Sequence, residues 1–212
     1  MRPLWRTMRT GGASSLLLAA VFAQACAPMF SDARLVGPGK AEVTPNVSAV
    51  GFSGGGETEH VLNQFGVQAV VGVHGRADVG VGYARLQAAE GGDGINAVGF
   101  GPRLALVPNR IALALPFGFA FGGEVEATRS WQWQPAVLFT VPLTDRIDFN
   151  PSARVLIPFC DGCDTMVGAN AGFGISAATR RLTFRPEFGL IFKPGESGVV
   201  WSFGFGVSFR GR

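Results

Sequence analysis

Residues 199–209, near the end of the chain, read VVWSFGFGVSF, and this stretch decides the fold. One set of alternate positions is bulky and apolar: Val199, Trp201, Phe203, Phe205, Val207 and Phe209. The set between them is mostly small or polar: Val200, Ser202, Gly204, Gly206 and Ser208. Because successive side chains of a strand point to opposite faces, this period of two predicts a β-strand with one aromatic face.

The same pattern repeats from Lys40 onward, in extended stretches of roughly 10–12 residues separated by breaks. It predicts ten strands, at 40–52, 62–74, 77–88, 95–107, 110–121, 130–142, 146–159, 166–178, 181–193 and 198–210. An even number of strands of this length is typical of membrane barrels. We therefore expect an all-β protein, a single antiparallel up-and-down transmembrane β-barrel of about ten strands.

The composition excludes several other classes of protein. Of the 212 residues, 47% are hydrophobic and only 16% are charged, which is too apolar for a disordered chain. The 31 glycines and 13 prolines argue against a mostly helical protein. No apolar run after residue 30 approaches the ~20 residues of a membrane-spanning helix. The mean hydropathy of +0.27 is nevertheless high enough for a membrane protein.

The alternative of a soluble barrel depends on which face is outside. A soluble barrel would turn its aromatic face inward and cover its exterior with charged side chains. Here the opposite face carries mainly Gly, Ala, Ser, Asn and Gln, which suit a narrow lumen better than a solvated surface. We therefore expect the aromatic face to contact lipid, with the inverted arrangement as the competing interpretation.

The breaks alternate in length, as expected if long outer loops alternate with tight periplasmic turns. The expected long breaks are 53–61, 89–94, 122–129 and 160–165, and the short ones are 75–76, 108–109, 143–145 and 179–180. Trp131, Trp133 and Trp201 then fall near the outer ends of lipid-facing strands, where they are expected to form an aromatic belt.

In this architecture, residues 40–212 resemble small Gram-negative outer-membrane β-barrel proteins, including the aromatic final strand Trp201–Phe209. The resemblance implies location in the outer membrane, contact with membrane lipid and lipopolysaccharide, and recognition of the C-terminal strand by the barrel-assembly machinery. Such barrels usually end on the aromatic residue, whereas Phe209 is followed by Arg210, Gly211 and Arg212. This difference weakens the match to the usual recognition signal.

The N-terminal segment has the features of an export signal. Arginines at the start precede the apolar stretch 13–22, and Ala23-Gln24-Ala25 forms an A-x-A cleavage site. Residues 1–25 are therefore expected to be a signal peptide, and residues 26–39 a periplasmic tether. Cys26 resembles the lipidated cysteine of bacterial lipoproteins, and the alternative is ordinary cleavage that leaves a free N-terminal cysteine.

The remaining cysteines, Cys160 and Cys163, flank Asp161-Gly162 in an expected outer loop. In an exported chain they can pair, and we expect a disulfide that staples the loop. A redox role is disfavoured because no helix follows to lower a thiol pKa. A metal site would need more ligands nearby, so neither a metal nor another cofactor is expected.

Charged residues inside the lumen offer the main functional hypothesis. Arg103, Arg154, Arg185 and Glu187 are expected to face inward near mid-height, with Glu187 pairing with one or more of the arginines. Such residues could form an ion-pair network that plugs the barrel, giving it a structural or surface-interaction role. Alternatively, surplus arginine could create a narrow, anion-preferring pore for small solutes.

Catalysis and nucleic-acid binding have little support. An enzyme needs its catalytic groups on one rim, but His60 is expected in the first outer loop and His74 inside the opposite end. Most acidic residues fall in the outer loops and many arginines at the periplasmic side, so no basic patch for nucleic acid forms. The acidic loops could instead gather divalent cations at the lipopolysaccharide surface.

Overall fold

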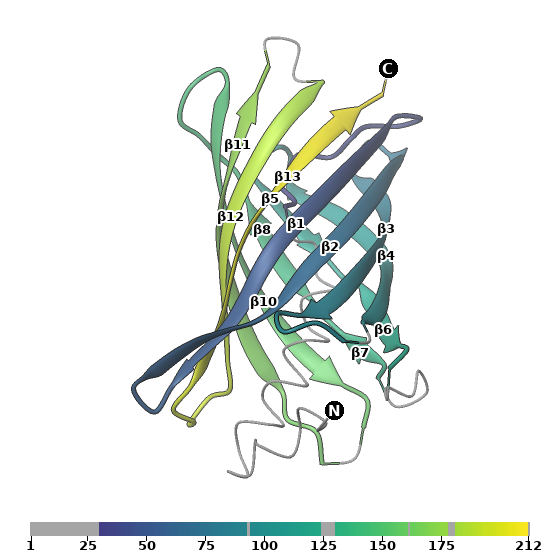
Figure 1. Cartoon of the computed structure of the whole chain (residues 1–212). Helices are drawn as coiled ribbons and strands as arrows, with labels where there is room; N and C mark the ends of the chain where they lie inside the picture. Colours follow the sequence, from purple (N-terminus) through teal and green to yellow (C-terminus); the bar gives the residue numbers. More distant parts are fainter. Residues whose placement is uncertain (1–29, 93, 124–129, 161, 178–180, 212) are drawn as a thin grey trace.

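The structure is a computed structural model that describes residues 30–92, 94–123, 130–160, 162–177 and 181–211. The expected signal peptide, Cys26 and residues 27–29 lie outside these ranges. The described chain forms a closed antiparallel barrel with ten wall strands (Figure 1).

Eight wall strands are continuous and two are interrupted by prolines. The strands are β1 (Ala41–Gly54), β2 (Glu57–His74), β3 (Ala77–Ala88), β4 (Ile95–Val107), β5 (Ile111–Ala114), β6 (Phe117–Phe121), β7 (Gln132–Trp133), β8 (Ala136–Phe139), β9 (Val141–Pro142), β10 (Ile147–Pro158), β11 (Met166–Ser176), β12 (Leu182–Phe192) and β13 (Val199–Arg210). Both β5 and β6 pair with β4, so together they form one wall strand. In the same way β7, β8 and β9 all pair with β10.

The two interruptions have a local cause. Pro116 separates β5 from β6, and Pro135 separates β7 from β8. Because proline has no N–H to donate, it breaks a strand ladder. Neighbouring backbone groups still bridge the gap, since Gln134 N–H donates to the Pro116 carbonyl at 2.9 Å.

The barrel closes between its first and last strands. Pairs run from Glu42 with Arg210 to Ser53 with Val199. The expected strands are thus confirmed in number and pairing direction, and their ends differ from the predicted ones by a few residues.

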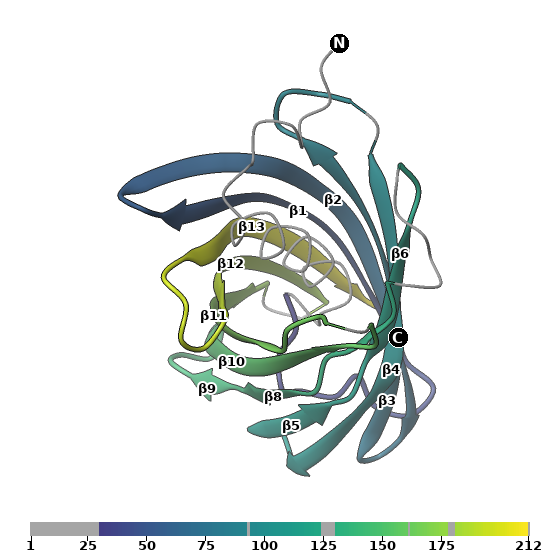
Figure 2. The same cartoon turned by 90° about the horizontal axis from the view of Figure 1, so that it is seen from below.

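The prediction of a long first loop at 53–61 is wrong. Instead β1 and β2 continue into a protruding hairpin with only Gly55 and Gly56 between them (Figures 1 and 2). Both glycines have positive φ, +63° and +86°, which is the conformation that a two-residue hairpin turn of type I′ requires. Glu57, Glu59 and His60 therefore belong to β2.

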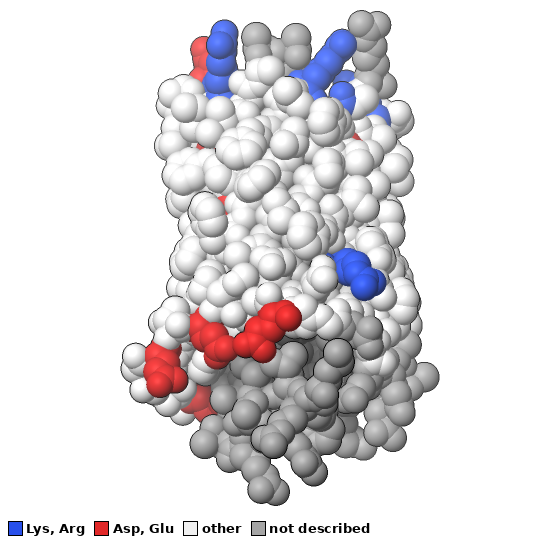
Figure 3. Space-filling view, in the orientation of Figure 1, with Lys and Arg blue, Asp and Glu red and all other residues white. Residues whose placement is uncertain are grey.

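The two ends of the barrel differ. The loop end carries the 55–56 hairpin and the connections 89–94, 122–131, 159–165 and 193–198, whereas the turn end carries 75–76, 108–110, 143–146 and 177–181. Figure 3 shows acidic side chains gathered toward the loop end and basic ones toward the turn end. The charge asymmetry expected from the sequence is present on this face of the barrel.

The side-chain distribution is inverted relative to a soluble protein. Large apolar side chains lie outside; Phe203 is 59% exposed and Phe209 is 52% exposed. Polar side chains lie inside, where Asp78 and Gln134 are both 0% exposed. An apolar exterior on a closed sheet leaves no unpaired edge and suits a hydrocarbon environment, so the aromatic face is the lipid-facing one.

In the described residues, no helix has both the length and the apolar character required to cross a membrane.

Candidate functional site

The lumen contains part of the chain itself. Residues 30–36, here called the lumen segment, come before β1 and lie among the inward-facing side chains of the wall. Figure 2 shows the first described residues, coloured purple, inside the ring of strands. The sequence analysis assigned these residues to a periplasmic tether, and the structure brings them into the barrel.

The central contact of the lumen segment is an ion pair. Arg185 of β12 donates from Nη2 to Asp32 Oδ2 at 2.9 Å, and its Nε donates to Ser208 Oγ at 2.6 Å. Glu42 Oε1 lies 3.5 Å from the same Nη2. The Arg185 side chain is only 4% exposed and that of Asp32 only 8%, so both charges are held away from bulk water. Because a charge in such a place is costly without a partner, this pair fixes the position of Asp32.

A second arginine holds the backbone of the same segment. Arg103 of β4 donates from Nη1 to the Asp32 carbonyl at 3.0 Å and from Nη2 to the Arg34 carbonyl at 3.3 Å. The same Nη2 also pairs with Asp78 Oδ2 at 2.5 Å. Arg103 therefore joins β3, β4 and the lumen segment.

The lumen segment contributes a cation as well. Arg34 forms a two-pronged contact with Asp148 of β10, with Nη2 to Oδ1 at 2.7 Å and Nε to Oδ2 at 3.1 Å. Such bidentate contacts are among the stronger charge-assisted hydrogen bonds. Sequence reasoning missed Asp32 and Arg34, because it considered only the wall residues as lumen groups.

Backbone amides supply further contacts. Phe30 N–H donates to Glu187 Oε2 at 2.9 Å, Ala33 N–H to Thr140 Oγ1 at 2.9 Å, and Val36 N–H to Asp78 Oδ2 at 3.0 Å. The acceptors lie on different wall strands. The segment is thus attached on several sides of the lumen.

Glycines in the wall provide the space for this segment. A Cβ on Gly206 would lie 3.3 Å from Phe30 Cγ and 2.9 Å from Thr44 Cγ2. At the turn end, a Cβ on Gly72 would lie 1.9 Å from the Gly37 carbonyl oxygen. Only glycine permits that approach, which lets residues 37–39 cross the rim along β2.

The sequence-predicted lumen residues are all inward and buried. Arg103, Arg154, Arg185 and Glu187 are 7%, 4%, 3% and 7% exposed, respectively. Glu187 accepts hydrogen bonds from Phe30 N–H and from Asn170 Nδ2, the latter at 2.5 Å. The carboxylates bound to Arg185 are Asp32 and Glu42, neither of which was among the predicted site residues.

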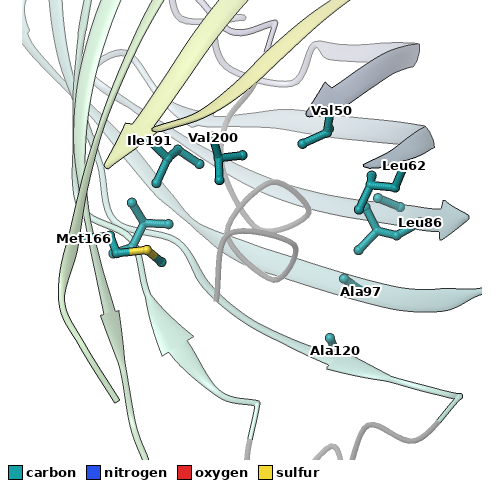
Figure 4. Packing of buried hydrophobic residues seen from close by; sticks show 10 residues of the cluster. Val50, Leu62, Leu86, Ala97, Ala120, Met166, Ile191 and Val200 are labelled. Atoms are coloured by element: carbon teal, nitrogen blue, oxygen red, sulfur yellow. The ribbon is translucent and has the colours of Figure 1, made fainter. Parts of the chain in front are cut away.

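Toward the loop end, the lumen changes from polar to apolar. A ring of inward apolar side chains, here called the collar, lies there (Figure 4); it consists of Val50, Leu62, Ala84, Leu86, Ala97, Ala120, Leu156, Met166, Ile191 and Val200. One inward position nearer the turn end, Ser48 follows Val50, Gln64 follows Leu62 and Ser202 follows Val200. The lumen therefore has an apolar layer above a polar one.

A small cavity of about 60 Å³ remains beside the lumen segment. Ser31 and Arg103 line it, together with four glycines of β3 and β4, Gly80, Gly82, Gly99 and Gly101. It marks where small wall residues leave space that the segment does not occupy.

The loop-end residues form a separate, exposed group. Cys160 and Cys163 are joined by a disulfide with 5.5 Å between their Cα atoms, which confirms the expected pair. Lys193 donates to Asp164 Oδ2 at 2.7 Å and to Glu196 Oε1, and these hydrogen bonds raise the pKa of Lys193. No cluster of three or more possible His, Cys, Asp or Glu metal ligands occurs within the described ranges.

The remaining candidate residues lie on the outside. Trp131 contacts Phe119 with 4.7 Å between ring centroids, and Trp133 stacks on Phe117 at 6.0 Å. Trp201 covers Gly51, where a Cβ would lie 2.2 Å from Trp201 Cζ2. His74 is exposed rather than inward, because the β2–β3 register shifts between Gly72 and His74.

Comparisons with known proteins add the following. No protein-family model and no curated protein sequence matches this chain. Three solved structures with a similar course of the chain are Ail of Yersinia pestis, the translocator domain of autotransporter NalP from Neisseria meningitidis, and the KdgM porin in complex with disordered oligogalacturonate. Their sequence identities to this chain are 10%, 9% and 7%, and the TM-scores are 0.39, 0.44 and 0.42.

The alignments cover 82%, 80% and 80% of this chain, and 99%, 88% and 98% of the three structures. Because the sequence identities are 10% or less and the TM-scores lie below 0.5, these likenesses carry no argument, and the fold is established by the strand pairing and the apolar exterior. On that structural evidence, the chain is a closed antiparallel β-barrel with the apolar exterior of a transmembrane barrel.

Proposed function

We propose that this protein is a closed outer-membrane barrel whose lumen is blocked by residues 30–36, and that it has a structural or surface-interaction role rather than an enzymatic one. The observation that carries the proposal is the buried ion pair between Asp32 and Arg185. A segment held in this way occupies the cross-section through which a solute would have to pass.

The size of the barrel supports a closed state. Ten strands enclose a narrow interior, whereas barrels with wide aqueous channels have about 16 strands. Long side chains and seven backbone residues share the interior of this barrel. The arginines that could select anions in a pore are engaged here, Arg185 with Asp32 and Arg103 with Asp78.

The proposed orientation places the loop end outside the cell. The acidic side chains Glu57, Glu59, Glu90, Asp164 and Glu196 are all exposed at or near that end. In this proposal the signal peptide 1–25 is removed on export, the final strand is the assembly signal, and the acidic loops contact lipopolysaccharide through divalent cations. Loss of Glu57 and Glu59 should then alter the outer-membrane barrier in a way that depends on magnesium concentration.

A narrow pore is the second candidate, and the 60 Å³ cavity is the observation that favours it. The two functions can be separated by single-channel recording in a planar bilayer with asymmetric KCl. The closed barrel should give a silent bilayer, and a variant lacking residues 27–36 should give discrete conductance steps. Heat-modifiable gel mobility must show that both proteins are folded. Steps from the unmodified protein, with a reversal potential shifted toward anions, would instead establish the pore.

A further inference from the structure

The apolar exterior of the barrel carries a cation on β3. Arg85 follows Val79, Val81 and Tyr83 on the outward face of this strand, and all four side chains are exposed. Away from the β1–β2 hairpin and the turn end, no other outward side chain of the described strands is charged. Because a cation on a lipid-facing surface is costly unless it reaches the membrane boundary or an anion, the position of Arg85 needs an explanation.

Arg85 lies at the level of a membrane boundary. It follows Arg76, in the turn between β2 and β3, by nine residues, which is about 30 Å along the strand. At a strand tilt of about 35–45°, this length gives a rise of about 21–25 Å along the barrel axis, and the apolar band of such barrels is about 25 Å tall. The two arginines therefore lie near opposite boundaries of the apolar band, with Arg85 on the side of the loop end.

Arg85 belongs to a group of polar side chains on the outward face, Tyr83, Arg85 and Asn96, here called the outer polar cluster. Asn96 of β4 is the cross-strand partner of Arg85. Asn96 Oδ1 accepts hydrogen bonds from the Tyr83 hydroxyl at 2.7 Å and from Arg85 Nη1 at 3.3 Å. In the next outward row toward the loop end, Asn63 pairs with Gln87. The outward face of β2, β3 and β4 thus changes from apolar to polar at the level of Arg85.

The long side chains of the outer polar cluster point toward the loop end. Tyr83 pairs with Val98 in the β3–β4 register, yet its hydroxyl reaches Asn96, which is two residues nearer the loop end. A Cβ on Gly94 would lie 2.9 Å from Arg85 Cζ, so the guanidinium lies beside the residue that precedes β4. Arg85 therefore carries its charge away from the apolar band and toward the level of the lipid headgroups.

The guanidinium keeps donors available for an outside ligand. In the part of the chain that the structure describes, Arg85 forms no salt bridge, and its side-chain hydrogen bond is the long one to Asn96. A guanidinium presents its N–H groups in a planar fork that matches the geometry of a phosphate. A phosphate at headgroup level would therefore supply the negative charge that the described side chains do not.

We propose that the outer polar cluster binds a phosphate group of lipopolysaccharide, the phosphorylated lipid of the outer leaflet. Arg85 contacts the phosphate, Asn96 positions the guanidinium, and Tyr83 holds Asn96. The acyl chains lie against exposed apolar neighbours, of which Phe65 is 51% and Val81 is 52% exposed. The inference rests on the orientation proposed above, with the loop end outside the cell. It differs from the contact proposed for the acidic loops, because it needs no divalent cation.

The test measures binding of lipid A to the folded, full-length protein in detergent by native mass spectrometry. EDTA is present throughout, so that contacts through divalent cations do not contribute. The probes are bisphosphorylated lipid A and dephosphorylated lipid A with the same acyl chains. Arg85→Gln is the test variant, and Arg76→Gln, which changes an exposed arginine at the turn end, is the matched control. Heat-modifiable gel mobility shows that each protein is folded.

We expect Arg85→Gln to weaken binding of bisphosphorylated lipid A by roughly 10-fold, as for the loss of a hydrogen bond to a charged group, and Arg76→Gln to leave it unchanged. The unmodified protein should bind dephosphorylated lipid A about as weakly as Arg85→Gln binds the phosphorylated form. Equal binding by the unmodified protein and Arg85→Gln would overturn the site, as would an equal loss in Arg76→Gln. Equal affinity of the unmodified protein for the two lipids would also overturn it, and this comparison does not depend on the folding of a variant.

A separate measurement tests the orientation on which the inference rests. Glu57→Cys and Arg76→Cys proteins are treated in intact cells with a maleimide too large to cross the outer membrane, and labelling is compared with that of the unmodified protein. Labelling at position 57 alone supports the orientation, and any other pattern would refute both the orientation and the outer-leaflet ligand. Labelling at position 57 alone, combined with phosphate-independent binding in detergent, would refute only the site at Arg85 and leave the proposed closed barrel unaffected.

Discussion

Replacing Asp32 by alanine should open the barrel part of the time. The substitution removes the carboxylate that faces Arg185 at 2.9 Å and leaves a buried guanidinium with weaker compensation. Removing one member of a buried ion pair typically costs about 3–5 kcal/mol. Arg185 still has Ser208 at 2.6 Å and Glu42 at 3.5 Å, so we take the lower value, about 3 kcal/mol.

This loss of about 3 kcal/mol should shift the equilibrium between the lumen segment bound inside the barrel and the lumen segment displaced from it. Since about 1.4 kcal/mol corresponds to a factor of ten, the displaced population should rise by roughly 100-fold. The backbone contacts of Phe30, Ala33 and Val36 remain, so brief openings are expected rather than a permanently open channel. The measurement is the open probability of single channels in a planar bilayer.

The control is Ser31→Ala, which changes the neighbouring residue beside the cavity and leaves the ion pair intact. Combining Asp32→Ala with Arg185→Met should give a smaller effect than the sum of the two single changes, because both residues belong to one network. A folded Asp32→Ala protein with the same open probability as Ser31→Ala and the unmodified protein would refute the reasoning.

Three further outcomes concern the wall and the loops. Gly56→Val should favour opening of the β1–β2 hairpin by about 1–2 kcal/mol, because valine is strained at the φ of +86° found there. Cleavage after Glu57 by a glutamate-specific protease should therefore become faster. The control is Gly75→Val, where the new side chain also meets open space but φ is not positive. Phe205→Arg should lower the free energy of unfolding in lipid vesicles by about 2–4 kcal/mol, and an effect no larger than that of Phe205→Leu would contradict a lipid-facing position. Reduction of Cys160–Cys163 should increase proteolysis of the 159–165 loop without altering heat-modifiable mobility; a loss of the folded band would show that the barrel itself depends on the disulfide.

The sequence predicted the wall well because its signal is local. Alternation such as Phe203–Gly204–Phe205–Gly206 determines which face each residue occupies, and the apolar exterior selects the lipid-facing side. The strand breaks at Pro116 and Pro135 could have been predicted from the missing N–H, although the two stretches were treated as uninterrupted. The Gly55–Gly56 turn was also visible in the sequence, but the surrounding polar residues resembled a loop.

The contents of the lumen were harder to predict. The stretch 30–38 has no strand period, and its position depends on contacts with residues more than 40 positions away, such as Val36 with Asp78 and Asp32 with Arg185. No local pattern determines such pairings. The one available signal was the presence of Asp32 and Arg34 beside a barrel interior that already contained opposite charges.

The way in which the wall holds the lumen segment has a consequence for variation and design. Phe30, Ala33 and Val36 are bound through their main-chain N–H groups, and Arg103 binds two main-chain carbonyls. These hydrogen bonds do not depend on side-chain identity, and the buried side chains of Phe30, Ala33 and Val36 need only fit the space that the wall leaves, while Asp32 and Arg34 contribute their own charges. The barrel can thus be regarded as a peptide receptor already loaded with its own ligand. A barrel deprived of residues 27–36 would be an empty receptor, which a short synthetic peptide keeping the Asp-x-Arg spacing could fill from outside.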